Sequence, residues 1–245
     1  MIPYMAFLLA VTIGLGGSFG CGRAVNRAAE RHIRDLLPDM LGEARVYRVH
    51  VEGDELATSH GKLDSVEING EDVQLSGGLL IDRLKVSLHK VDADLDHRKL
   101  RSIGAATFAA TISSRTLDEY LAGESPEDER IRNAHVTLRN GEVTISAERV
   151  VLGAGVPFRV YGPLKVIGPH RIELDPNRLV VVGVPITGVP LRFLKRRFES
   201  AIDLSGLGVP MVLESVRTEN GKLILSGSPD ITAMLKAHAR EEGER

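Results

Sequence analysis

Hydrophobic and polar residues alternate along most of this chain, which is the pattern of half-buried β-strands. The exception comes early, because residues 22–41 carry apolar side chains every three or four positions opposite a row of charges. This spacing predicts an amphipathic helix that Pro38 kinks or ends. The period of two then predicts strands at 47–51, 66–68, 73–75, 84–95, 105–112, 136–138, 143–147, 158–166, 171–174, 179–182, 211–216 and 223–225.

Three stretches each read as two strands joined at an Asn-Gly pair: VEINGEDVQLSG (66–77), VTLRNGEVTIS (136–146) and VRTENGKLILSG (216–227). Asn-Gly tolerates the two positive φ values of a two-residue hairpin turn. We therefore expect three hairpins. Short helices are predicted at 116–121, where Thr116 and Glu119 have the spacing of a capping box, at 190–202 and at 231–240.

The longest predicted strand changes the face it buries. In LKVSLHKVDADLD (84–96), the apolar residues up to Leu88 share one phase, whereas those from Val91 onward share the other. One extra residue at His89–Lys90 restores a common face, which predicts a β-bulge and a bend in the sheet.

This many strands present more apolar surface than the predicted helices can cover. A sheet with one apolar face needs a partner layer, and only the helix at 22–41 is long. Either the sheet folds over on itself or another molecule fills it. An acyl chain is a suitable filler, since two chains of about sixteen carbons carry on the order of 25 kcal/mol of transfer free energy at roughly 0.8 kcal/mol per methylene.

Composition narrows the class of partner. The 245 residues carry a formal net charge of −2, with 4% aromatic residues and no tryptophan, which disfavours a nucleic-acid surface built on basic charge and stacking rings. The single cysteine, Cys21, allows neither an internal disulfide nor a cysteine-based zinc site.

The first residues differ from the rest, because residues 3–20 contain no charge. Their apolar centre has the length of a signal-peptide core, and Ser18–Cys21 is similar to a bacterial lipobox, which makes Cys21 a candidate for acylation. Ser18 stands where a leucine is expected, and an uncleaved membrane anchor is the alternative. Arg23, Arg27 and Arg31 then favour a cytoplasmic domain, so the side of the membrane stays open.

No group of residues has the pattern of a catalytic or metal site. Asp92–His97 begins like a calcium loop, but His97 and Ile103 stand where glycine and glutamate are required. A solvated acidic face is the simpler interpretation. The histidines lack ligand spacing, and neither a dinucleotide loop nor a nucleophile elbow is present. We expect no metal, no cofactor and no catalytic residue.

Two sets of residues are candidates for lipid contact. The segment LRFLKRRF (191–198) reads as a basic amphipathic helix that meets anionic headgroups, although a solvated helix face is the alternative. Its candidate contacts are Arg192, Phe193, Lys195, Arg196 and Arg197. The candidate groove residues, for which ordinary core packing is the alternative, are Leu88, Val91, Phe108, Ile112, Phe158, Val160 and Leu164.

The order of these elements resembles the LmeA-like family of bacterial cell-envelope proteins, which is associated with phospholipid binding. The resemblance is carried by 84–96, ATFAATISSRTLDEYL (106–121), 136–146, VPFRVYGPLKVIGPHRIELDPNRLVVVGVPI (156–186) and IDLSGLGVPMVLESVRTENGKLILSG (202–227). It implies a β-rich α+β fold in which a long, twisted antiparallel sheet curls around the N-terminal helix, similar to tubular lipid-binding folds. The family supplies no catalytic residue to transfer.

We therefore expect three parts: an anchor or signal segment at 1–21, one lipid-binding β-rich domain at 22–228, and a helix with a charged tail at 229–245. The leading hypothesis is a non-enzymatic, membrane-associated protein of the cell envelope that holds or shuttles a phospholipid or another acyl lipid in an apolar groove. The alternative is a structural protein that pairs with partners through its sheet edges. A lipid-modifying enzyme ranks third, and a nucleic-acid partner is not expected.

Overall fold

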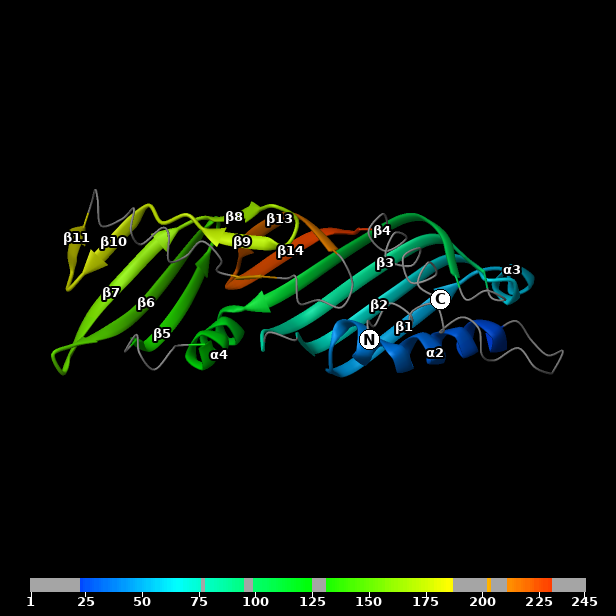
Figure 1. Cartoon of the computed structure of the whole chain (residues 1–245), viewed down its shortest axis with the longest axis horizontal. Helices are drawn as coiled ribbons and strands as arrows, with labels where there is room; N and C mark the ends of the chain where they lie inside the picture. The colour runs from blue at the N-terminus through cyan, green and yellow to red at the C-terminus, as the bar shows by residue number, and fades with distance from the viewer. Residues whose placement is uncertain are drawn as a thin grey trace, which may run out of the picture.

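The strands form three antiparallel sheets in an elongated body, with the two largest sheets following one another along its long axis (Figure 1). The computed structural model describes residues 23–75, 78–94, 99–124, 131–186, 202–203 and 211–230. The six-stranded sheet has the order β1 (Ala44–Glu52), β2 (Lys62–Gln74), β3 (Leu80–Asp94), β4 (Lys99–Ser113), β14 (Lys222–Pro229) and β13 (Met211–Glu219).

The five-stranded sheet has the order β11 (Val184–Ile186), β10 (Arg178–Val181), β7 (Ala154–Gly162), β6 (Glu142–Val151) and β5 (Ile131–Arg139). A three-stranded sheet of β12 (Ile202–Asp203), β9 (Arg171–Leu174) and β8 (Leu164–Ile167) completes the set. The β-rich α+β class with antiparallel pairing is thus confirmed. The strands are divided among separate sheets, whereas the sequence predicted one long sheet.

Pro163 is where the predicted strand 158–166 divides into β7 and β8. Proline cannot donate to a strand ladder, and the Pro163 carbonyl instead accepts a hydrogen bond from the Asp175 amide at 2.9 Å. Gly162 permits this crossing, because a Cβ there would lie 2.2 Å from the Asp175 carbonyl oxygen. The chain therefore leaves the five-stranded sheet at this point.

The predicted N-terminal helix is α2 (Arg23–Leu41), and Pro38 does not end it. The helix stops one turn later, where Gly42 takes a φ of 107° and donates its amide to the Pro38 carbonyl at 3.0 Å. α2 packs along β1, at the edge of the six-stranded sheet (Figure 1). A short helix that the sequence did not predict, α3 (Glu55–Ser59), follows β1 and is capped by the Asp54 carboxylate.

The helix α4 (Ser114–Glu124) confirms the prediction at 116–121, although its cap differs. The Ser113 hydroxyl accepts from the Thr116 amide at 3.3 Å, and the Thr116 hydroxyl donates to Asp82 Oδ1 at 2.6 Å. Thr116 therefore ties the first turn of α4 to β3, and the predicted capping box between Thr116 and Glu119 is wrong.

Two of the three predicted Asn-Gly turns are confirmed. Asn140–Gly141 joins β5 to β6, and Asn220–Gly221 joins β13 to β14 with φ values of 49° and 74°. The third prediction is wrong, because β2 runs straight through Asn69–Gly70. Gly70 is buried there, and a Cβ would lie 2.9 Å from Tyr47 Cε1. Glycine at this position thus makes room for a ring on β1.

The predicted change of phase in the long strand is confirmed, but the predicted extra residue at His89–Lys90 is wrong, because pairing shows no residue inserted in β3 there. Lys90 takes a φ of 52°, which returns Leu88 and Val91 to one buried face. Pairing with β2 stays in register across this point. The register shift against β4 lies between Asp92 and Ala93, where β4 carries the extra residue, Arg101.

Several predictions lie outside the described residues. These are the leader with Cys21, most of the helix predicted at 190–202, with Arg192, Phe193, Lys195, Arg196 and Arg197, and the helix and tail from 231 onward. Within α2, α3 and α4, no stretch is both long and apolar enough to cross a bilayer.

Candidate functional site

A continuous apolar face crosses all six strands of the largest sheet. Strand pairing places one residue of each strand in a row across it. One such row is Tyr47, Gly70, Leu84, Ala110, Leu225 and Val216. The next row is Val49, Ile68, Val86, Phe108, Gly227 and Leu213. Period-two alternation on every strand therefore gives one broad hydrophobic surface.

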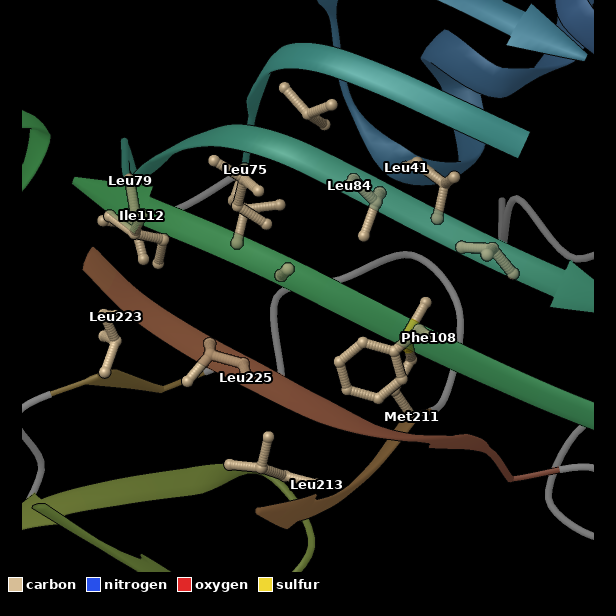
Figure 2. Packing of buried hydrophobic residues seen from close by; sticks show 14 of the residues in the cluster. Leu41, Leu75, Leu79, Leu84, Phe108, Ile112, Met211, Leu213, Leu223 and Leu225 are labelled. Atoms are coloured by element: carbon tan, nitrogen blue, oxygen red, sulfur yellow. The ribbon is translucent and has the colours of Figure 1, made fainter. Parts of the chain in front are cut away.

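The centre of this face is tightly packed. Ile112, Leu223 and Leu225 are each 0% exposed. Figure 2 shows these side chains on the same face as Phe108 of β4 and Met211 and Leu213 of β13. Gly227 makes room for the Phe108 ring, since a Cβ there would lie 2.8 Å from Phe108 Cε1. A small residue on one strand thus accommodates a large side chain in the same row on the neighbouring strand.

The opposite face of the same sheet is charged. On β1 and β2, Arg45 contacts both Glu71 and Asp72 at 2.6 Å, and Arg48 contacts Glu71 at 2.5 Å. The hydrogen bond from Arg48, with the charges of both arginines, holds the pKa of Glu71 below its usual value. These pairs are solvent-exposed and add little stability, so their main effect is to keep this face in water.

The seven predicted groove residues belong to one hydrophobic cluster but lie on three different sheets. Leu88, Val91, Phe108 and Ile112 lie on β3 and β4 and are buried. The remaining three are Phe158 and Val160 on β7 and Leu164 on β8, of which only Val160 is fully buried. The structure therefore joins these residues through a shared core, without bringing all seven to one opening.

Open space adjoins the apolar face where the two large sheets meet. A cavity of about 390 Å³ is lined by Leu164 of β8, by Val216 and Arg217 of β13, and by the β5–β6 turn at Asn140. We call it the joint cavity. Val216 stands at the end of the row that contains Leu84 and Leu225, so the joint cavity continues the apolar face at its β13 edge. Its volume lies within the range of about 300–1,000 Å³ that is typical of ligand pockets.

A second cavity, of about 350 Å³, lies on the five-stranded sheet. Phe158 contributes to its lining, together with Pro157, Arg159, Val180 and Val182. Pro157, Arg159 and Val180 alternate with the buried Val160, so this cavity opens on the outer face of the sheet. Phe158 and Leu164 therefore line separate cavities.

Three buried polar atoms have no hydrogen-bond partner within the described part of the chain: Asn26 Oδ1, Thr58 Oγ1 and Asp92 Oδ1. Asn26 and Thr58 both lie next to Gly53, because Asn26 Nδ2 donates to the Gly53 carbonyl at 3.3 Å and a Cβ on Gly53 would lie 2.7 Å from Thr58 Oγ1. No sequence pattern points to either residue. A threonine inside a five-residue helix carries no pattern that distinguishes it from a surface threonine.

Carboxylates from two helices cover two of the sheet edges. Glu30 of α2 accepts from the Val51 amide of β1 at 3.1 Å. In the same way, Asp118 of α4 accepts from the Val136 amide of β5. An edge strand whose amide is already bonded is a poorer template for a partner strand. This finding disfavours the alternative that partners pair with the protein at β1 or β5.

Across the described residues, no three His, Cys, Asp or Glu side chains gather closely enough to hold a metal ion. Asp92 does not form the start of a metal loop there, because Ala93 continues the strand and donates its amide to the Gly61 carbonyl at 2.9 Å. The chemistry that the described surface offers is hydrophobic burial with a few polar groups at the rim.

Comparison with known proteins agrees with this geometry. Neither the curated proteins nor the solved structures include a match to this chain. Residues 16–228 match the model of a family described as LmeA-like phospholipid-binding, and this span includes every described strand except the last residue of β14. The description is that of a lipid-binding family. The chain therefore belongs to the LmeA-like phospholipid-binding family.

Proposed function

We propose that this protein binds a phospholipid without chemically changing it, and that the acyl chains lie in the joint cavity and along the adjoining apolar face. The observation that carries the proposal is the continuity between the two. Val216 lines the joint cavity and also ends a row of apolar side chains that reaches Tyr47 on the far edge of the sheet. An acyl chain in the joint cavity thus contacts the apolar face at its β13 edge.

The energetics favour such an occupant. Each methylene that leaves water contributes about 0.8 kcal/mol, so even half of one acyl chain supplies roughly 6 kcal/mol. The rim provides polar groups beside these apolar walls, because Arg217 and Asn140 also line the joint cavity. A guanidinium group pairs well with a phosphate. We assign Arg217 as the contact for the lipid headgroup.

We further propose that the two large sheets form a curved wall around the lipid, as in tubular lipid-binding folds. Cys21 is proposed to carry a lipid anchor, and Arg192, Phe193, Lys195, Arg196 and Arg197 are proposed to contact membrane headgroups at the cell envelope. A mass increase at Cys21 that is lost in Cys21→Ala tests the anchor.

Native mass spectrometry of the gently purified protein tests lipid binding, and three variants test its location. Leu164→Asp places a charge in the joint cavity, whereas Ile167→Asp places the same charge on the same strand at an exposed position. Phe158→Asp places it at the second cavity. We expect the wild type and Ile167→Asp to retain phospholipid, and Leu164→Asp to lose it.

Circular dichroism identifies variants that remain folded. A folded Leu164→Asp variant that keeps its lipid contradicts the assignment of the joint cavity. Loss of lipid from Phe158→Asp alone moves the site to the five-stranded sheet. A wild-type protein that carries no phospholipid, and takes up none from vesicles, contradicts the proposed function itself.

A further inference from the structure

Exposed apolar side chains gather at one end of the molecule. Among the described residues, four of the six large hydrophobic side chains that are exposed belong to two hairpins: Val151 and Leu152 to the β6–β7 hairpin, and Val182 and Val184 to the β10–β11 hairpin. Leu152 is 99% exposed and Val182 is 65% exposed. Both hairpins lie at the end of the body farthest from α3 (Figure 1), and we call them the distal tips.

The backbone at the distal tips favours other residues. Leu152 and Val182 each have a φ of 49°, and each is followed by a glycine with positive φ. A two-residue turn of this kind prefers asparagine before glycine, and for a β-branched residue such as valine this φ is a clear outlier. The same chain uses Asn220 at the same φ of 49° in the β13–β14 turn. At the distal tips, an apolar side chain thus replaces the residue that suits the turn.

Positive charge dominates around the distal tips. Residues 150–158 and 179–186 contain no charged side chain. Behind these uncharged stretches stand Arg149 and Arg159, both exposed, and neither has an ion pair within the described part of the chain. The nearest carboxylate, Glu148, accepts a hydrogen bond from Asn133 at 3.2 Å. Apolar side chains at the ends of the hairpins, with arginines behind them, match the order of the acyl-chain and headgroup layers at a lipid surface.

We propose that the distal tips dock the protein on an anionic lipid bilayer. Leu152 and Val182 enter the boundary between headgroups and acyl chains, while Arg149 and Arg159 face the lipid phosphates. A protein partner fits less well, because a stable protein interface needs about 800 Å² per partner, and two narrow turns offer no flat surface of that size. The proposed docking requires neither the joint cavity nor residues 187–201.

The absence of tryptophan from the chain allows a local test. Leu152→Trp and Val182→Trp each place a single indole at a distal tip, and Asn220→Trp places one in the matched turn of the six-stranded sheet. The full-length variants are mixed with vesicles of phosphatidylcholine and phosphatidylglycerol, with and without brominated acyl chains. We expect a blue shift and quenching by bromine for the two tip variants, and neither change for Asn220→Trp. This readout reports on the tips even if residues 1–21 also bind the bilayer.

Adding Arg149→Gln and Arg159→Gln to Leu152→Trp is expected to reduce the quenching on anionic vesicles. Indoles that stay in water at both tips, while sedimentation shows the protein on the vesicles, overturn the proposal. So does a protein that does not bind these vesicles. A blue shift that appears without vesicles and grows with protein concentration also overturns it, because the tips then join copies of the chain. Leu152→Asn tests the backbone strain at this turn separately, because asparagine suits the positive φ. We expect this variant to require more denaturant for unfolding than the wild type.

Discussion

The hydroxyl group of Thr218 donates a hydrogen bond to the backbone carbonyl of Arg139 at 2.5 Å, which joins two sheets across 79 positions of sequence. The same oxygen accepts from the Gly141 amide at 2.9 Å. Thr218 lies near the end of β13 and is buried, while Arg139 ends β5. One side chain therefore fixes the β5–β6 turn against the six-stranded sheet, and it does so in the wall of the joint cavity.

Replacing Thr218 by valine keeps the shape of the side chain and removes both hydrogen bonds. The Gly141 amide and the Arg139 carbonyl then lose their bonds to this oxygen, so we expect the free energy of unfolding to fall by about 1–3 kcal/mol. Denaturant unfolding measures this loss. Thr107→Val on β4 is the control, because Thr107 is exposed and is expected to change stability by less than about 0.5 kcal/mol. Equal stability of both variants contradicts the role given to Thr218.

Gly70→Ala tests the packing that replaced the expected turn. The added methyl group would lie 2.7 Å from Val73 Cγ2 and 2.9 Å from Tyr47 Cε1. Overpacking of this kind costs about 1–3 kcal/mol, which thermal or denaturant unfolding detects. Gly123→Ala in α4 is the control, because no atom lies within 4 Å of the new methyl group there, and it is expected to stabilise the helix by about 0.5–1 kcal/mol. A Gly70→Ala variant that is as stable as the wild type would contradict the close packing of Gly70 against Tyr47 and Val73.

Tyr47 gives the six-stranded sheet a dependence on alkaline pH. Burial, with a smaller effect from the charge of Glu43, raises the pKa of Tyr47 above its ordinary value. The resulting stability is fully present below the unfolded pKa of about 10, and it is lost as the pH rises toward the higher folded pKa. The unfolding free energy of the wild type is therefore expected to fall more steeply than that of Tyr47→Phe between about pH 8 and about pH 11.

At neutral pH, we expect the wild type to be more stable than Tyr47→Phe. The Tyr47 hydroxyl donates to the Gly42 carbonyl at 2.7 Å, so Tyr47→Phe is expected to cost about 1 kcal/mol there. The two stability curves should converge on the alkaline side. Curves that stay parallel over the whole range contradict a raised pKa.

Local sequence patterns predicted the helices, strands and turns better than they predicted which of these elements contact one another. The helix at 23–41 and the turn at Asn220–Gly221 follow from apolar spacing and turn chemistry, which act within a few residues. The turn predicted at Asn69–Gly70 failed for a tertiary reason. Glycine at position 70 leaves space for the Tyr47 ring, and no local sequence pattern reports a ring on a neighbouring strand.

The same limit applies to the candidate site. Alternation placed Phe108 and Ile112 correctly on a buried face, because burial follows period two. It could not show that Leu164 and Phe158 line different cavities, since Pro163 sends the chain into another sheet between them. Nor could it identify Thr218 as the link between two sheets, because a buried threonine near a strand end looks like any other strand residue.

The central claim is that acyl chains lie in the joint cavity and along the apolar face beside it. Photocrosslinking with a phospholipid that carries a diazirine in its acyl chain tests this most directly, with the labelled residues located by peptide mass spectrometry. We expect the label on β8 and β13, at Leu164 and Val216, and not at Arg45 or Glu71 on the charged face. Label on the charged face, or none on the protein at all, would contradict the account.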